Sequence, residues 1–169
     1  MVSANGCAIV SNMKERIYIE TSVISYLTGR PARDVVIAAH QELTRQWWET
    51  RASRFDILVS ELVREEASGG DAEAARRRMA AIGDIPVLKA DDAAVTLAER
   101  LILHGPIPQQ SAADALHIAI AAVNGLDYLL TWNCSHLANA AHRQRIAALV
   151  EAAGYVCPVI CTPEELMED

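Results

Sequence analysis

The stretch RIYIETSVISYL, residues 16–27, contains the two kinds of element that decide the fold. Residues 16–20 form a short run of β-branched and aromatic side chains, which is typical of a strand. Ser22 then offers an N-cap for a short helix that continues to Leu27 and is ended by residues 29–31, GRP. A strand that passes directly into a helix predicts the first unit of an α/β domain.

Strand-like and helical patterns alternate along the rest of the chain. Strand patterns recur at residues 55–60, 86–90, 127–132 and 155–161. Helical patterns lie between them, at residues 35–48, from 61 to the Gly69-Gly70 pair, at 71–82, from Asp91 onward, at 111–124 and at 140–153, and residues 163–166 form a final turn. Because parallel strands need crossover connections, this alternation predicts a mainly parallel sheet that is covered by helices.

Two of the helical segments show which side they are expected to bury. In residues 35–48 the apolar side chains that recur at three- and four-residue steps are Val36, Ala39, Leu43 and Trp47. In the helix that Asp91 caps, the corresponding side chains are Ala94, Leu97, Ala98 and Leu101. These stripes are predicted to face the core.

The composition bounds the class of protein. A chain of 169 residues has the length of about one domain, and 51% hydrophobic residues argue against general disorder. The net charge of -7 excludes a strongly basic nucleic-acid coat, but it leaves open a local basic face or a metal-bridged nucleic-acid site. The four cysteines, Cys7, Cys134, Cys157 and Cys161, are too irregularly spaced for a disulfide framework, which favours the reducing cytoplasm.

The domain organisation is expected to be simple. Residues 1–13 lack the basic region and long apolar stretch of a signal peptide, so we expect a flexible N-terminal tail there. Residues 14–169 contain no repeat or linker and are predicted to form a single domain. No segment approaches the ~18 uninterrupted apolar residues of a membrane span, so no membrane interaction is expected.

Acidic residues follow the predicted strands at the places where parallel sheets build their sites. Such sites form beyond the carboxyl ends of the strands. Glu20 follows the first strand, Glu66 lies on the helix after the second, Asp114 begins the helix before the fourth, and Asn133 follows the fourth. Carboxylates that converge in this way repel one another unless a cation compensates them, and hard oxygen ligands suit Mg²⁺ or Mn²⁺.

Spacing selects Glu66 among the three glutamates of its helix. It shares the apolar face of Leu62 and Val63, whereas Glu61 and Glu65 lie together on another face. A carboxylate on a core-facing stripe is costly unless it has a partner. Alternatively, Glu66 lies at the margin of the apolar stripe, where its carboxylate reaches solvent and needs no partner.

Each of the other candidates has a structural alternative. Glu20 is equally compatible with an ordinary exposed acid, Asp114 with a capping box that begins at Ser111, and Asn133 with a turn. Ser22 and Thr131 flank the acids, where they either orient ligands or cap a helix and close a turn. His117, one helical turn after Asp114, either faces the site or is a core histidine, and we favour the core histidine. His136, three residues after Asn133, either contacts the substrate or is a loop histidine, and we favour the loop histidine.

Four segments together carry a resemblance to a known family. They are YIETSVISYL (18–27), VSELVREEASGG (59–70), ADALHIAIA (113–121) and YLLTWN (128–133). In this order and at these separations they resemble the PIN-domain family, which includes the VapC-type toxin ribonucleases of toxin–antitoxin pairs. The resemblance implies a three-layer α/β/α sandwich, a Mg²⁺- or Mn²⁺-dependent nuclease site, an RNA substrate, an antitoxin partner and a homodimer.

The resemblance also implies roles for individual residues. The metal-binding acids of the family fall on Glu20, Glu66 and Asp114, and a fourth catalytic position falls on Asn133. Two of these depart from the family pattern, because Glu20 and Asn133 stand where Asp is usual. Asn133 removes a negative charge, so we expect one tightly held ion, with any second ion arriving with the substrate.

Phosphate contacts and competing functions complete the expectations. Candidate phosphate contacts are Arg30, Arg33, Arg143 and Arg145. The run at residues 76–78, RRR, is interpreted as a solvated face or as a site for an acidic antitoxin segment. The alternative function is a catalytically weak or inactive PIN-like module that binds RNA or protein. Another Mg²⁺-dependent phosphoryl-transfer enzyme lacks support, because the chain has neither a GxxxxGK[ST] loop nor a GxGxxG fingerprint.

Overall fold

The computed structural model describes residues 13–168, so the tail expected at residues 1–13 lies outside the described residues except for Met13. The strands are β1 (Arg16–Ile19), β2 (Asp56–Ser60), β3 (Val87–Leu88), β4 (Tyr128–Leu130) and β5 (Val159–Cys161). The helices are α1 (Thr21–Thr28), α2 (Val35–Thr50), α3 (Glu61–Ser68), α4 (Ala72–Ile82), α5 (Asp92–His104), α6 (Ala112–Val123) and α7 (Ala140–Ala152). The predicted alternation of strands and helices is therefore confirmed.

The five strands form one parallel sheet in the order β3-β2-β1-β4-β5. In the register of the central strands, Tyr18 of β1 lies between Leu58 of β2 and Leu129 of β4. The chain builds outward from β1 to β3 and then crosses to the other side of β1 to form β4. The point between β1 and β4 is thus a topological switch point, where open parallel sheets bind ligands.

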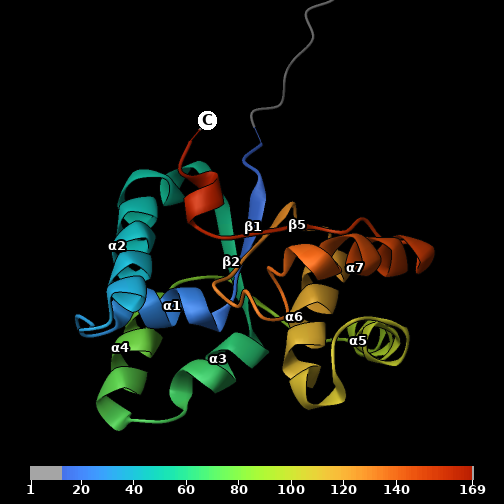
Figure 1. The fold of residues 1–169 in the computed structure, drawn as a ribbon, viewed down its shortest axis with the longest axis horizontal. Helices are drawn as coiled ribbons and strands as arrows, with labels where there is room; N and C mark the ends of the chain where they lie inside the picture. The colour runs from blue at the N-terminus through green and yellow to red at the C-terminus, as the bar shows by residue number, and fades with distance from the viewer. Residues whose placement is uncertain (1–12, 169) are drawn as a thin grey trace, which may run out of the picture.

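Helices cover both faces of the sheet. Helices α1 to α4 lie together on one side and α5 to α7 on the other, with the strands between them (Figure 1). Helix α1 packs against α2, α3 and α4, while α5 packs against α6 and α7. This arrangement is the parallel sheet covered by helices that the sequence pattern predicts, and the three-layer α/β/α sandwich that the family resemblance implies.

The core is centred on β1 and α6. The side chains of Ile17, Tyr18 and Ile19 are fully buried, as expected for a central strand with helices on both faces. All four residues of the stripe predicted for α5 are buried as well, namely Ala94, Leu97, Ala98 and Leu101. Within the described residues, no helix combines the length and the hydropathy needed to cross a bilayer.

The stripe predicted for α2 is wrong in its first half. Val36 is 62% exposed and Ala39 is also exposed, whereas the buried face carries Gln41, Thr44 and Trp47. Gln41 faces inward because its amide bonds with two backbone groups of the preceding loop, Arg30 O at 2.8 Å and Ala32 N at 3.0 Å. Satisfied hydrogen bonds allow a polar side chain on the buried face, and apolar periodicity does not report this effect.

The start of α1 also differs from the prediction. The helix begins at Thr21, and its N-cap is Glu20, whose carboxylate accepts a hydrogen bond from Ser22 N. Ser22 is therefore inside the first turn, and its hydroxyl is free to contact Glu20 and the backbone N–H of Trp132. The expectation that the cysteines form no disulfide framework holds for the described ones, since Cys134, Cys157 and Cys161 are free.

Candidate metal and substrate site

Glu20 is held at the carboxyl end of β1 by three hydrogen bonds. Its Oε1 accepts from Ser22 N at 3.0 Å, and its Oε2 accepts from the hydroxyls of Ser22 and of Thr131, the latter at 2.7 Å. Only 7% of Glu20 is exposed, so the alternative of an ordinary exposed acid is wrong. The structure thus places Ser22 and Thr131 in contact with Glu20, and their role in orienting a metal ligand stays a prediction.

Glu66 projects from α3 toward the same place. Its Oε2 accepts a hydrogen bond from the Thr21 hydroxyl and lies 3.2 Å from His117 Nε2. Burial acts to raise the pKa of the Glu66 carboxyl, but the hydrogen bond and attraction of His117 and the bond from Thr21 outweigh it. The pKa of Glu66 therefore lies below its ordinary value, and the group is a carboxylate at neutral pH.

A buried chain of hydrogen bonds stands behind Glu66. His117 Nδ1 lies 2.8 Å from the Tyr18 hydroxyl, which in turn lies 2.6 Å from Ser60 Oγ. Burial raises the pKa of Tyr18, against the opposing effect of the Ser60 bond, so this phenol stays neutral. Because a carboxylate only accepts hydrogen bonds, Nε2 of His117 donates to Glu66 and orients it.

His117 satisfies both interpretations that its position allowed. It is 1% exposed and fully partnered, as a core histidine should be, and it also contacts a candidate metal ligand. The signal that finds it is its place one helical turn after Asp114 on α6, which aims both side chains at the same edge of the sheet.

Three side chains offer ligand atoms to a common point. One atom each of Glu20, Glu66 and His117 lies within 4.8 Å of the others, and they come from β1, α3 and α6. Two carboxylates in so small and largely buried a space repel each other, and within residues 13–168 neither forms an ion pair with Lys or Arg. A divalent cation fits this donor set and would relieve the repulsion.

Asp114 lies on α6 in a neighbouring group of side chains. Its Oδ1 accepts from Asn133 Nδ2 at 3.0 Å, and its Oδ2 lies 2.7 Å from His136 Nδ1. Ser111 occupies the N-cap position of α6, but its side chain makes no capping bond, so the capping-box alternative is wrong. Asp114 is not part of the group around Glu20 in the described residues, and its membership of one metal site with Glu20 and Glu66 stays a prediction.

The two groups are joined through the segment after β4. Thr131 Oγ1 donates to Glu20 and accepts from the backbone N–H of Asn133 at 2.9 Å. Asn133 Oδ1 accepts from His136 N at 3.1 Å, so Asn133 does close a turn and also contacts Asp114. The sequence alone indicates a loop histidine at His136, and only the folding of residues 133–136 back toward α6 reveals its contact with Asp114.

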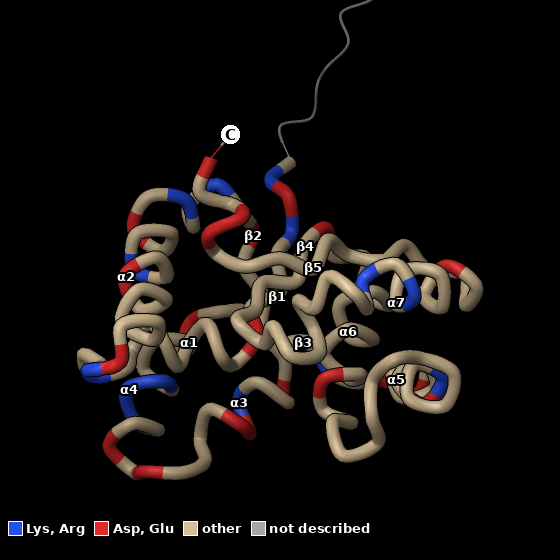
Figure 2. The backbone as a smooth tube through the Cα atoms, viewed as in Figure 1, with Lys and Arg blue, Asp and Glu red and all other residues tan. Residues whose placement is uncertain are grey.

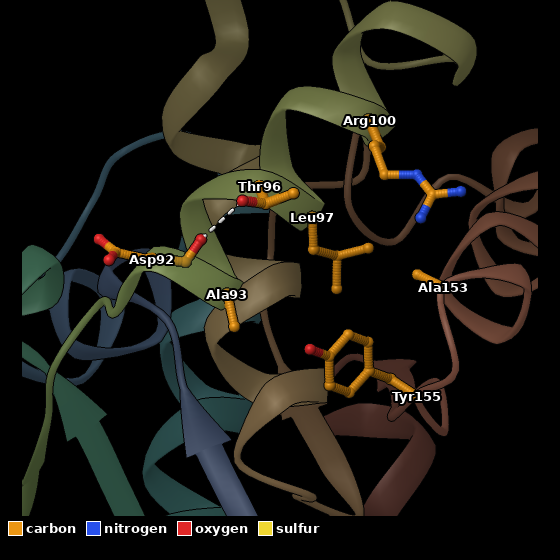
Figure 3. Close-up of a pocket in the computed structure, with 7 residues that line it drawn as sticks. All are labelled: Asp92, Ala93, Thr96, Leu97, Arg100, Ala153 and Tyr155. Carbon is orange, nitrogen blue, oxygen red and sulfur yellow. Dashed lines mark hydrogen bonds between the residues drawn. The ribbon is translucent and has the colours of Figure 1, made fainter.

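An open groove of about 690 Å³ leads to Glu20 and Glu66. Its other walls are formed by Tyr26 of α1, by the Gly69-Gly70 pair after α3 and by Arg78 of α4. Figure 3 shows a different pocket, of about 270 Å³, between α5 and the end of α7. That pocket contains no residue of the acidic group, so we assign the site to the groove.

Comparisons with known proteins support the same fold. No protein-family model and no curated protein matches the sequence. A crystal structure of VapC20 from Mycobacterium tuberculosis, a toxin that cleaves the sarcin–ricin loop, is similar at 17% identity and a TM-score of 0.54, covering 83% of this chain and 96% of that one. VapBC2 from Rickettsia felis, bound to a DNA fragment from its promoter, is similar at 14% identity and a TM-score of 0.54, covering 86% of this chain and 97% of that one. The chain therefore has the fold of the PIN-domain VapC toxins.

Proposed function

We propose that this protein is a metal-dependent endoribonuclease that hydrolyses RNA phosphodiesters and acts as the toxin of a type II toxin–antitoxin pair. The observation that carries the proposal is the convergence of Glu20, Glu66 and His117, with Asp114 one turn from His117, at the switch point of a VapC-type sheet. The RNA-cleaving activity of the similar VapC20 supports the choice of substrate.

The roles of the residues follow from their contacts. When bound, Mg²⁺ or Mn²⁺ polarises a phosphoryl oxygen and lowers the pKa of the attacking water. Glu20, Glu66 and Asp114 would hold the ion, and Asn133 offers an amide oxygen beside Asp114. Ser22 and Thr131 keep the Glu20 carboxylate in place, and His117 keeps that of Glu66 in place. No cysteine or serine nucleophile is needed.

The partners belong to the same proposal. The similarity to a VapBC2 structure supports an antitoxin protein as the partner that neutralises the chain. A cytoplasmic homodimer is the expected form of the active protein. Co-expression with a small protein encoded directly upstream tests the pairing, because a matching antitoxin restores growth that the toxin alone arrests.

A second candidate function is a catalytically weak or inactive module that binds RNA or protein. The observation that favours it is that both carboxylate oxygens of Asp114 are engaged, by Asn133 and by His136. In this alternative, the amide in place of an acid at Asn133 leaves too little negative charge to hold an ion.

One cleavage assay separates the two functions. Labelled RNA is incubated with the protein in Mg²⁺ or Mn²⁺, in EDTA, and with the variants Asp114→Asn and Asp92→Asn. Asp92 is the matched control, because it is an exposed acid in the first turn of α5. We expect cleavage by the parent and by Asp92→Asn with metal, and loss of cleavage in EDTA and in Asp114→Asn. RNA binding without cleavage under every condition contradicts the nuclease and supports the second function.

A further inference from the structure

The arginine run of α4 does not form a uniform solvated face. Helix α4 packs against α1 and α3, and Figure 2 shows its basic residues beside α1. The Arg76 side chain is 76% exposed and pairs with Glu73 at 2.6 Å. Arg77 bonds with Thr28 O and pairs with Glu73 at 3.4 Å. Arg78 instead lines the groove that contains Glu20 and Glu66, so the run at 76–78 presents one of its three cations to the candidate site.

The guanidinium of Arg78 is fixed by backbone carbonyls rather than by an acid. Its Nε donates to Ala67 O at 3.0 Å and its Nη2 to Gly69 O at 2.6 Å. These carbonyls belong to the end of α3, where backbone acceptors lack helical partners. Within residues 13–168, no carboxylate forms an ion pair with Arg78. The group therefore keeps its full charge and further N–H donors, in a fixed orientation, for an anion.

The groove beside Arg78 is open at Gly70 and is also lined by an aromatic ring. At Gly70, with φ +76°, an added Cβ would find no atom within 4 Å, so the floor between α3 and α4 is open. Tyr26 lines the same groove, and its ring packs edge-on with the rings of His40 and Trp132, with centroid distances of 5.6 and 6.1 Å. A fixed aromatic ring along a groove that also holds a fixed cation is the arrangement that single strands use, with bases on the ring and phosphate on the cation.

We propose that the groove between α1, α3 and α4 is an RNA subsite in which Arg78 binds a phosphate next to the one that is cleaved. Tyr26, which lines the same groove, contacts the nucleotide that carries this phosphate. This inference rests on the proposed nuclease function and specifies how that site holds its substrate. Arginine suits the role because its planar fork matches two phosphate oxygens at once. Arg78 is a binding residue here and takes no part in the bond-breaking step.

The salt dependence of RNA binding tests the subsite. Binding of a labelled single-stranded RNA is measured at several salt concentrations with the cleavage-deficient Asp114→Asn protein, alone and combined with Arg78→Gln or Arg76→Gln. Losing one phosphate contact lowers the slope of log affinity against log salt by about 0.7 for a single strand. We expect this loss, with affinity about tenfold weaker at low salt, for Arg78→Gln alone, because Arg76 is turned toward Glu73.

A second substitution guards against a folding effect, since Arg78 also caps the end of α3. Arg78→Lys keeps the charge and loses the fork, so we expect the parent salt slope with an intermediate affinity, and each variant's melting temperature is recorded beside it. Equal slopes for Arg78→Gln and Arg76→Gln overturn the subsite. If the parent protein then still cleaves RNA with metal, only the subsite has failed. Absence of metal-dependent cleavage by the parent overturns the nuclease proposal itself.

Discussion

The two ends of the same parallel sheet treat acidic side chains in different ways. At the amino end, Asp127 accepts a hydrogen bond from Arg16 N at 2.7 Å, and Glu15 accepts one from the Tyr128 hydroxyl at 3.3 Å. At the carboxyl end, Glu20, Glu66 and Asp114 collect among hydroxyls, histidines and an amide. In the described part of the chain, no Lys or Arg pairs with these three acids.

On the proposed function, the difference separates acids that link strand ends from acids that bind a metal ion. Acids at the amino end link β1 to β4, since Asp127 bonds with Arg16 N and Glu15 with the Tyr128 hydroxyl. Acids at the carboxyl end bring like charges together, which costs stability unless a cation enters. Local arrangements that oppose stability are expected at functional sites. Substitutions matched between the two ends test this distinction.

The largest effect on activity is expected when one acid at each end of the sheet is replaced by its amide, Glu66→Gln at the carboxyl end and Asp127→Asn at the amino end. Glu66→Gln removes a proposed metal ligand, so we expect metal-dependent RNA cleavage to fall by about 100-fold. We also expect Mn²⁺ to raise the melting temperature of the parent protein but not that of Glu66→Gln, because a ligand stabilises only a state that binds it. Calorimetric melting with and without Mn²⁺, beside the cleavage assay, measures both.

Asp127→Asn is the control for that exchange. It weakens a bond at a strand end, so we expect a loss of about 1 kcal/mol in unfolding free energy, with cleavage and the Mn²⁺ response retained. Equal losses of Mn²⁺ response in both variants would show that the carboxyl end has no special affinity for the ion.

A smaller effect is expected from two Tyr→Phe substitutions, each of which removes one hydroxyl. Tyr18→Phe breaks the chain from Ser60 to His117 and leaves Glu66 less well oriented. We expect about tenfold weaker Mn²⁺ binding, since partners behind a metal ligand typically contribute this much. Tyr128→Phe removes a hydroxyl at the amino end and should leave Mn²⁺ binding unchanged. Titration of the Mn²⁺ paramagnetic signal measures the affinity without using activity, and equal affinities contradict an orienting role for Tyr18.

The topology of the sheet, and the edge at which the candidate residues lie, were predictable from the sequence because they depend only on the order of strand and helix patterns. The alternation of strand and helix patterns is sufficient to indicate a parallel sheet, and such a sheet brings the residues just after its strands to one edge. That rule singled out Glu20 and Asn133, the apolar face of its helix singled out Glu66, and the start of the helix before the fourth strand singled out Asp114. The contacts among these side chains depend on their rotamers, which the spacing of residues in the sequence does not predict.

For His136 and Arg78 the sequence predicted other surroundings than the structure shows. Their contacts depend on the path of a loop and on the rotation of a helix. His136 contacts Asp114 because residues 133–136 turn back toward α6. Arg78 and Arg76 have different partners because of the rotation of α4 against α3. That rotation turns Arg78 toward the carbonyls of Ala67 and Gly69 and leaves Arg76 with Glu73. The orientations of both side chains are set by packing between segments that are distant in the sequence, so local sequence patterns do not predict them.

The smallest effect concerns an acid at the carboxyl end that does have a cation. Glu165, which follows β5, bonds with Thr162 N at 2.8 Å and pairs with Arg143 of α7 at 3.1 Å. Burial acts to raise the pKa of Glu165, but the bonds from Arg143 and Thr162 outweigh it and hold this pKa below its ordinary value. If pairing distinguishes structural acids from ligand-binding ones, Glu165→Gln should lower stability slightly and leave cleavage and Mn²⁺ binding unchanged.

The pH dependence of that loss has a definite sign. Because the pKa of Glu165 is lower in the folded state, its stabilisation is complete above the unfolded pKa of about 4.3 and disappears as pH falls through the folded value. Both side chains of the pair are more than a third exposed, so the difference at pH 7 should stay below about 1 kcal/mol. Urea unfolding of the parent and of Glu165→Gln between pH 7 and pH 3 should show the two converging in acid. A difference that widens in acid, or a loss of cleavage at pH 7, would mean that pairing with a cation does not separate the two kinds of acid at this edge.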